Sequence, residues 1–110
     1  SHCKTRMKWM NRINRKRASI NLGGPTFRWV HLCLNAIKAL PKIIPRVETP
    51  VLILQAEKEK IVDNKNLEKL TALFPHAESM LVPQAKHEIL FEKDNVRKAV
   101  LERVNQFLHS

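Results

Sequence analysis

The apolar and polar positions of the first seventeen residues follow a helical period. Met7, Met10 and Ile13 are spaced three residues apart among many lysines and arginines. Apolar residues at this interval fall on one face of a helix. The pattern therefore predicts a basic amphipathic helix between residues 3 and 17.

A second helical pattern follows a break in the chain at Gly23-Gly24. Thr26 is of the type that caps helix amino termini. Apolar residues then recur every three or four positions, at Trp29, Val30, Cys33, Leu34, Ile37 and Leu40. Pro41 and Pro45 lack the backbone N–H that a helix interior uses. We therefore expect a helix that starts after Thr26 and is ended by Pro41 and Pro45, with Cys33 packed in a core.

The second half of the chain alternates strand and helix patterns. Val51–Leu54 is a continuous apolar run, typical of a strand buried on both faces of a parallel sheet. A helical stripe over residues 66–74, a second strand over residues 79–82 and a helix after Asp94 follow. This order predicts a right-handed βαβ crossover with a parallel strand pair. The fold class is therefore α/β, with a helical segment over residues 1–46 and a βαβα unit over residues 47–110.

A parallel pair of strands is incomplete as a sheet. Parallel strands are normally covered on both faces and have further neighbours, and a two-stranded sheet is marginally stable in water. With 110 residues the chain has room for one domain at most. We expect the missing strands to come from a larger chain or from a partner.

The positive charge is confined to the first half. Residues 1–50 contain eleven lysines and arginines and the single acid Glu48, so they account for the whole net charge of +10. This excess of positive charge indicates one of two things. It belongs either to a solvated helical face or to a surface that contacts an anionic partner, which would be a nucleic acid or a lipid surface. No nucleic-acid-binding signature accompanies it, and aromatic residues are 5% with no tyrosine. A nucleic acid is therefore the less favoured partner.

Cysteine and histidine usage indicates neither a disulfide framework nor a bound metal. Cys3 and Cys33 are thirty positions apart, and the five histidines show no paired spacing. We expect two free thiols, no metal and no cofactor. No apolar stretch approaches the roughly 20 residues that cross a bilayer.

Two loops carry the candidate chemistry. Glu59 and Asp63 follow the first predicted strand, and His87 follows the second. Parallel strands end at the same edge of a sheet, which is where open α/β sheets bind ligands. A carboxylate there can accept the histidine Nδ1–H and so prepare Nε2 to take a proton. Glu59 is the favoured acid, and Asp63, four positions away, is the alternative.

The chain has no recognisable nucleophile. It contains no Gly-x-Ser-x-Gly elbow, and Ser79 opens a strand between Glu78 and Met80, so we interpret it as structural. The 110 residues are therefore not expected to turn over ester substrates by themselves.

Several segments resemble a known family. Residues 49–57 are similar to the strand and acid loop of the monoglyceride-lipase-like α/β-hydrolases. Residues 54–57 with 62–64, and residues 87–94, resemble bacterial inner-membrane lysophospholipases of that group. Residues 23–30 are similar to a segment near the end of the cap region of these proteins. The resemblance covers nearly the whole chain, most convincingly from residue 23 onward.

The resemblance implies a function and a location. It identifies the chain as the carboxyl-terminal part of a serine hydrolase acting on lysophospholipids or monoacylglycerols. His87 falls on the catalytic histidine, and Glu59 stands where related lipases usually place aspartate. The basic first half would then belong to the cap, and the hydrolase core with its serine would precede residue 1. The expected location is cytoplasmic, with peripheral contact to the anionic inner membrane. The alternative is a non-catalytic basic module that binds nucleic acid or an anionic membrane surface.

Overall fold

The structure, a computed structural model, describes residues 1–20 and 23–110. Its helices and strands follow one another as α1 (Lys4–Lys16), α2 (Phe27–Ile43), β1 (Val51–Ala56), α3 (Asn64–Thr71), β2 (Ala77–Val82) and α4 (Asp94–Leu108). Short 3₁₀ turns lie at Ala18–Ile20, Ile44–Arg46 and Ile89–Phe91. The expected strand–helix–strand–helix order of the second half is confirmed.

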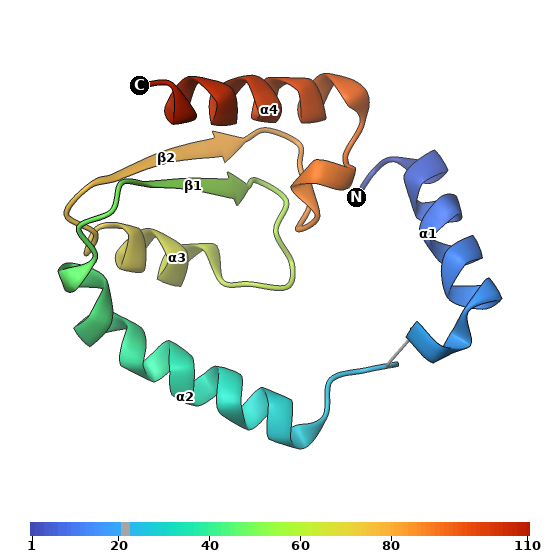
Figure 1. Cartoon of the computed structure of the whole chain (residues 1–110), viewed down its shortest axis with the longest axis horizontal. Helices are drawn as coiled ribbons and strands as arrows, with labels where there is room; N and C mark the ends of the chain where they lie inside the picture. The colour runs from blue at the N-terminus through green and yellow to red at the C-terminus, as the bar shows by residue number, and fades with distance from the viewer. Residues whose placement is uncertain (21–22) are drawn as a thin grey trace.

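The two strands form a parallel pair. Val51 lies opposite Ala77 at one end, and Ala56 lies opposite Val82 at the other. Figure 1 shows α3 and α4 on opposite sides of this pair, while α1 and α2 form an arc that leads from the amino terminus round to β1. Because β1 and β2 run in the same direction, the loops that follow them emerge together, near the amino terminus of the chain (Figure 1).

The hydrophobic core is small and lies beside the strand pair. Its buried members are Ala56, Val82, Ala85 and Val100, with Leu54, Ile89 and Val96 packed against them. The radius of gyration is 16.4 Å, against about 13 Å for a compact domain of this length. The described residues therefore form an open arrangement in which the second half holds most of the buried apolar surface.

Helix α2 runs through Pro41, the first of the two prolines expected to end it, and stops before Pro45, the second. It continues to Ile43 with Pro41 inside it. A proline in the last turn removes only one hydrogen bond, the one that would reach the carbonyl of Ile37. The backbone N–H of Ile44 then bonds the carbonyl of Leu40, which restores the helical pattern. The expected cap is confirmed, because the Thr26 side chain accepts a hydrogen bond from a backbone N–H of the first turn.

The expectation that Cys33 is packed in a core is wrong. Cys33 is half-buried, and α2 has no buried residue. The side chains of Phe27 and Trp29 are 97% and 58% exposed, so the apolar stripe of this helix has little protein against it among the described residues. The helical period correctly placed these residues on α2, but period alone does not say whether a partner surface is present. Both cysteines are free thiols, as expected.

Candidate functional site

The two loops at the carboxyl edge of the strands are joined to each other by hydrogen bonds. The backbone N–H of Glu57 donates to the carbonyl of Val82 at 3.2 Å, and that of Lys58 donates to the carbonyl of Ala85 at 2.8 Å. The Glu57 carboxylate accepts the backbone N–H of Gln84 at 2.7 Å. The acid loop and the histidine loop therefore form one connected unit.

A tight turn directs the chain from β2 toward the histidine. The N–H of Ala85 donates to the carbonyl of Val82 at 3.3 Å across Pro83 and Gln84. Gln84 has a φ of 64°, in the left-handed region that favours glycine. Proline followed by a residue with positive φ is the pattern of a type II turn. Gln84 is further held by the Lys58 ammonium, which donates to its side-chain oxygen at 2.6 Å.

The Glu59 carboxylate accepts hydrogen bonds from three backbone N–H groups and from His87. Its Oε1 accepts the backbone N–H groups of Lys60, Ile61 and Val62 at 2.9, 2.8 and 3.4 Å. Its Oε2 lies 2.8 Å from Nδ1 of His87. Burial favours the neutral acid and so raises the pKa of Glu59, but these backbone donors and His87 lower it to about 2. Glu59 is therefore a carboxylate at any ordinary pH.

The charge of Glu59 decides the tautomer of His87. A carboxylate can only accept hydrogen bonds, so the proton of the 2.8 Å contact must lie on the histidine Nδ1. In the neutral ring this leaves Nε2 as a proton acceptor. The Glu59 side chain is 8% exposed, whereas that of His87 is 44% exposed. The arrangement presents a proton acceptor at the surface, oriented from behind by the largely covered carboxylate of Glu59.

Asp63 and Ser79 have other surroundings. Asp63 caps α3, where its Oδ1 accepts the backbone N–H of Lys65 at 2.9 Å. Ser79 lies exposed within β2, away from the carboxyl edge that carries His87. Of the two acids that the sequence offered, the structure places Glu59 against the histidine.

A small cavity lies beside the histidine. Its volume is about 210 Å³. Three lysines contribute to its wall, and the full lining is Ser1, Lys58, Lys60, Ile61, Lys86, His87 and Glu88. The lysine ammonium groups outnumber the single carboxylate, which makes the surroundings of His87 favourable to an anionic group.

Sequence reasoning missed Glu92, the one charged residue classed as buried within the described ranges 1–20 and 23–110. Its residue surface is 1% exposed, and its carboxylate accepts hydrogen bonds from His2 and from the backbone N–H of Lys86. The sequence contains one indication that Glu92 is buried, because Glu92 directly follows the apolar residues Ile89–Phe91. An acid in such a position is buried only when donors compensate it.

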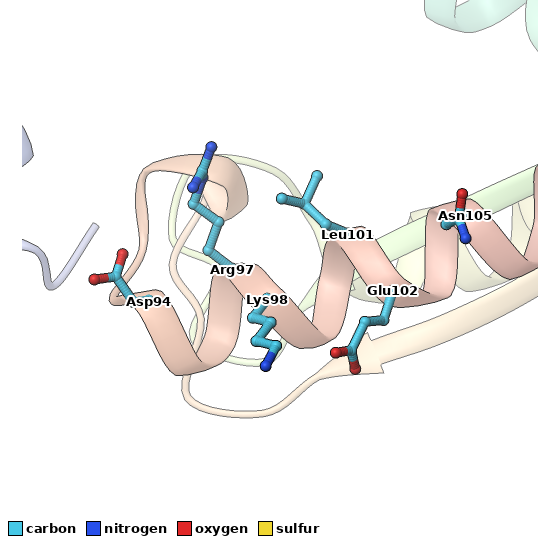
Figure 2. Close-up of a pocket in the computed structure, with 6 residues that line it drawn as sticks. All are labelled: Asp94, Arg97, Lys98, Leu101, Glu102 and Asn105. Atoms are coloured by element: carbon cyan, nitrogen blue, oxygen red, sulfur yellow. The ribbon is translucent and has the colours of Figure 1, made fainter.

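A larger hollow on α4 carries no comparable chemistry. Figure 2 shows its lining along the outer surface of this helix, formed by Asp94, Arg97, Lys98, Leu101, Glu102 and Asn105. Its volume is about 530 Å³, yet it contains neither a nucleophile nor a histidine.

Residues 1–20 and 23–110 contain no group of three or more histidine, cysteine, aspartate or glutamate side chains able to hold a metal ion. Over the same residues, none of the helices combines the length and apolar character needed to cross a membrane.

Comparison with known proteins identifies a matching family and similar proteins. A family described as the alpha/beta hydrolase fold matches residues 1–94. A Haemophilus influenzae protein named probable lysophospholipase L2 is 78% identical over 107 residues, or 97% of this chain. Lysophospholipase L2 of Escherichia coli K12 is 31% identical over 116 residues, or 99% of this chain. The chain spans only about a third of the length of either relative, 34% in both cases. No solved structure matches it.

Proposed function

The chain belongs to the α/β-hydrolase fold family, and from this premise we propose that it supplies the acid and the base of a serine hydrolase that cleaves acyl esters of lysophospholipids or monoacylglycerols. The observation that carries the proposal is the contact of 2.8 Å between Glu59 and the Nδ1 of His87. The two residues lie on neighbouring loops at the carboxyl edge of the strands, where ligands bind in open α/β sheets.

The geometry supports a general-base role for His87. Nε2 takes the proton of a serine hydroxyl as the serine oxygen attacks the acyl carbon, and Glu59 stabilises the imidazolium that results. The same proton then passes to the departing glycerol oxygen, and water releases the acid from the acyl-enzyme by the same route. The chain contains no Gly-x-Ser-x-Gly elbow, so the proposal assigns the nucleophile to another segment of the hydrolase.

The proposed substrate class has two supports. The two relatives are named lysophospholipases, one of them as probable. The cavity beside His87 is lined by Lys58, Lys60 and Lys86. Lysine ammonium groups bind phosphate as point charges, which favours a phosphate-bearing lysophospholipid over a neutral monoacylglycerol.

The proposal is tested in a chimaera, defined as the Haemophilus influenzae relative in which this chain replaces the 107 aligned residues. Release of fatty acid from lysophosphatidylcholine and from a monoacylglycerol is measured. We expect the chimaera to hydrolyse lysophosphatidylcholine at a rate within about tenfold of the unmodified relative, since 78% of the exchanged positions are identical. The 110-residue chain alone is expected to show no turnover, because it lacks the nucleophile elbow.

The unmodified relative serves as the positive control for folding and assay. A chimaera that folds like this relative but hydrolyses neither ester, while the relative does, would exclude the proposed function. Turnover by the isolated 110 residues would instead place a nucleophile within them and overturn the assignment of the serine to another segment.

We further propose that α1 brings the protein to anionic membrane surfaces from the cytoplasmic side. Lys4, Lys8, Arg12 and Arg15 are exposed and recur at three- and four-residue intervals, so they share one face of the helix. Trp9, 57% exposed, lies at the border of this face. Each lysine or arginine near an anionic bilayer contributes roughly 1 kcal/mol to binding.

Replacing these four residues with glutamine is expected to weaken binding of the chain to phosphatidylglycerol vesicles by on the order of 10²–10³-fold. Vesicle co-sedimentation at low and at physiological salt measures the effect. A matched control exchanges the exposed residues Lys65, Lys69, Lys93 and Lys98 of the second half. Equal losses in the two variants, or tighter binding to duplex DNA than to vesicles, would contradict a membrane-directed α1.

A further inference from the structure

We propose that Glu92 is a positioning residue for the histidine of the site. Its buried carboxylate fixes the backbone immediately before His87 and ties that backbone to the amino-terminal segment. The inference rests on the proposed function, because it requires His87 to act as the base. It adds a residue that acts through the histidine without contacting the reacting atoms.

Glu92 contacts the histidine loop through a backbone hydrogen bond. Glu92 Oε1 accepts the backbone N–H of Lys86 at 3.0 Å. Lys86 directly precedes His87, so this bond restrains the backbone one residue before the one that carries the imidazole. Glu59 restrains His87 itself, through the ring nitrogen Nδ1 at 2.8 Å. Glu59 therefore holds the side chain of His87, and Glu92 holds the backbone N–H of the residue before it.

Glu92 also links the histidine loop to the first residues of the chain. Glu92 Oε2 accepts the backbone N–H of His2 at 2.8 Å, and Oε1 lies 3.1 Å from the imidazole Nδ1 of His2. The Arg6 guanidinium donates to the backbone carbonyl of Glu92 at 2.7 Å and to the Asp94 carboxylate. Residues 1–6, which lead into α1, and residues 86–94, which contain the histidine loop, thus meet at Glu92.

The carboxyl group of Glu92 is held in its charged form. Burial raises the pKa of Glu92, but the backbone N–H groups of His2 and Lys86 and the imidazole of His2 lower it to about 2. The ionised carboxylate is thus matched to these donors, and a buried charge in this state is costly to replace. A glutamine in its place would offer one acceptor oxygen and turn an NH₂ group toward donors. At least one of these N–H groups would then be left without an acceptor.

The test compares Glu92→Gln and Glu92→Asp in the chimaera, with Glu102→Gln as the matched loss of an exposed carboxylate on α4. We expect Glu92→Gln to lower kcat for lysophosphatidylcholine about 10- to 100-fold, as misplacement of a catalytic group by about 1 Å does. KM should stay within about threefold, because the substrate contacts remain. Glu92→Asp, which keeps a carboxylate on a shorter arm, should fall between Glu92→Gln and the parent.

A spectroscopic readout separates positioning from simple destabilisation. In histidine-labelled protein, the Nδ1–H proton of His87 bonded to Glu59 should resonate far downfield, and Glu92→Gln should shift or broaden it while the circular dichroism spectrum is retained. Glu102→Gln should leave this signal and kcat unchanged.

Three results would overturn the proposal. The first is a folded Glu92→Gln variant with kcat within twofold of Glu102→Gln. The second is a loss of kcat that matches the loss of folded protein. The third is failure of both Glu92 variants to fold, which would assign the residue to stability alone. A parent chimaera without any esterase activity would instead count against the proposed function.

Discussion

Replacing His87 with alanine in the chimaera is expected to reduce kcat for lysophosphatidylcholine by about 10⁴- to 10⁶-fold. The expectation follows from the state of the ring. Glu59 holds Nδ1 at 2.8 Å as a donor, so Nε2 is the acceptor that a serine hydroxyl would need. Without the imidazole, the serine proton has no acceptor and the departing oxygen has no donor. Initial rates of fatty acid release measure the loss.

His109→Ala is the matched control for this experiment. His109 is an exposed histidine at the end of α4, and its Nδ1 contacts the backbone carbonyl of Asn105 within the same helix. We expect its replacement to change kcat by less than about twofold, as surface substitutions usually have small effects. A His87→Ala enzyme that keeps more than a tenth of the parent activity would exclude His87 as the base.

Exchange of Glu59 for glutamine is expected to lower kcat by about 10⁴-fold, with KM nearly unchanged. The amide can donate a proton as well as accept one, so it no longer enforces the Nδ1–H tautomer of His87. It also removes the negative charge that stabilises the imidazolium during proton transfer. Steady-state kinetics of the chimaera, together with the downfield Nδ1–H signal, measure both consequences.

Asp63→Asn is the informative counterpart, because Asp63 was the other candidate acid. Asparagine is an equally good helix cap, so the start of α3 should be preserved. We expect kcat within about threefold of the parent. The reverse pattern, a mild Glu59 variant and an inactive Asp63 variant, would transfer the role of the acid to Asp63.

The free energy of unfolding is expected to decrease in acid, because the pKa values of two carboxyl groups are lowered in the folded chain. Glu59 and Glu92 both have a pKa of about 2 in the folded chain, below the ordinary 4.5. The folded state therefore binds fewer protons than the unfolded state between these pH values. Their stabilising contribution is complete above pH 4.5 and is lost as the pH falls toward 2. Glu59→Gln removes one of these two groups. The free energy of unfolding of this variant should therefore decrease less steeply between pH 4.5 and pH 2 than that of the parent.

The sequence predicted the backbone of the second half well because its signals are local. The run Val51–Leu54 and the helical stripes determine strand and helix by period, and the parallel pairing follows from their order. The resemblance to α/β-hydrolases and lysophospholipases is likewise confirmed by the family match and the named relatives. The division at residue 46 and the inner-membrane location stay predictions.

The sequence did not predict features that depend on a partner surface or on distant contacts. Trp29 is exposed because little is packed against it. Glu92 meets His2 across ninety positions of sequence. No local period indicates a contact of that kind.

The joined loops have a kinetic consequence. Glu59 and His87 are 28 positions apart, and the bonds between their loops involve residues close to them in sequence. Contacts at short sequence separation form early, because little chain entropy is lost in closing them. The acid and the histidine can therefore find each other while the contact between His2 and Glu92, 90 positions apart, is still to be made. The tautomer of His87 would then be set before residues 1–6 dock against Glu92.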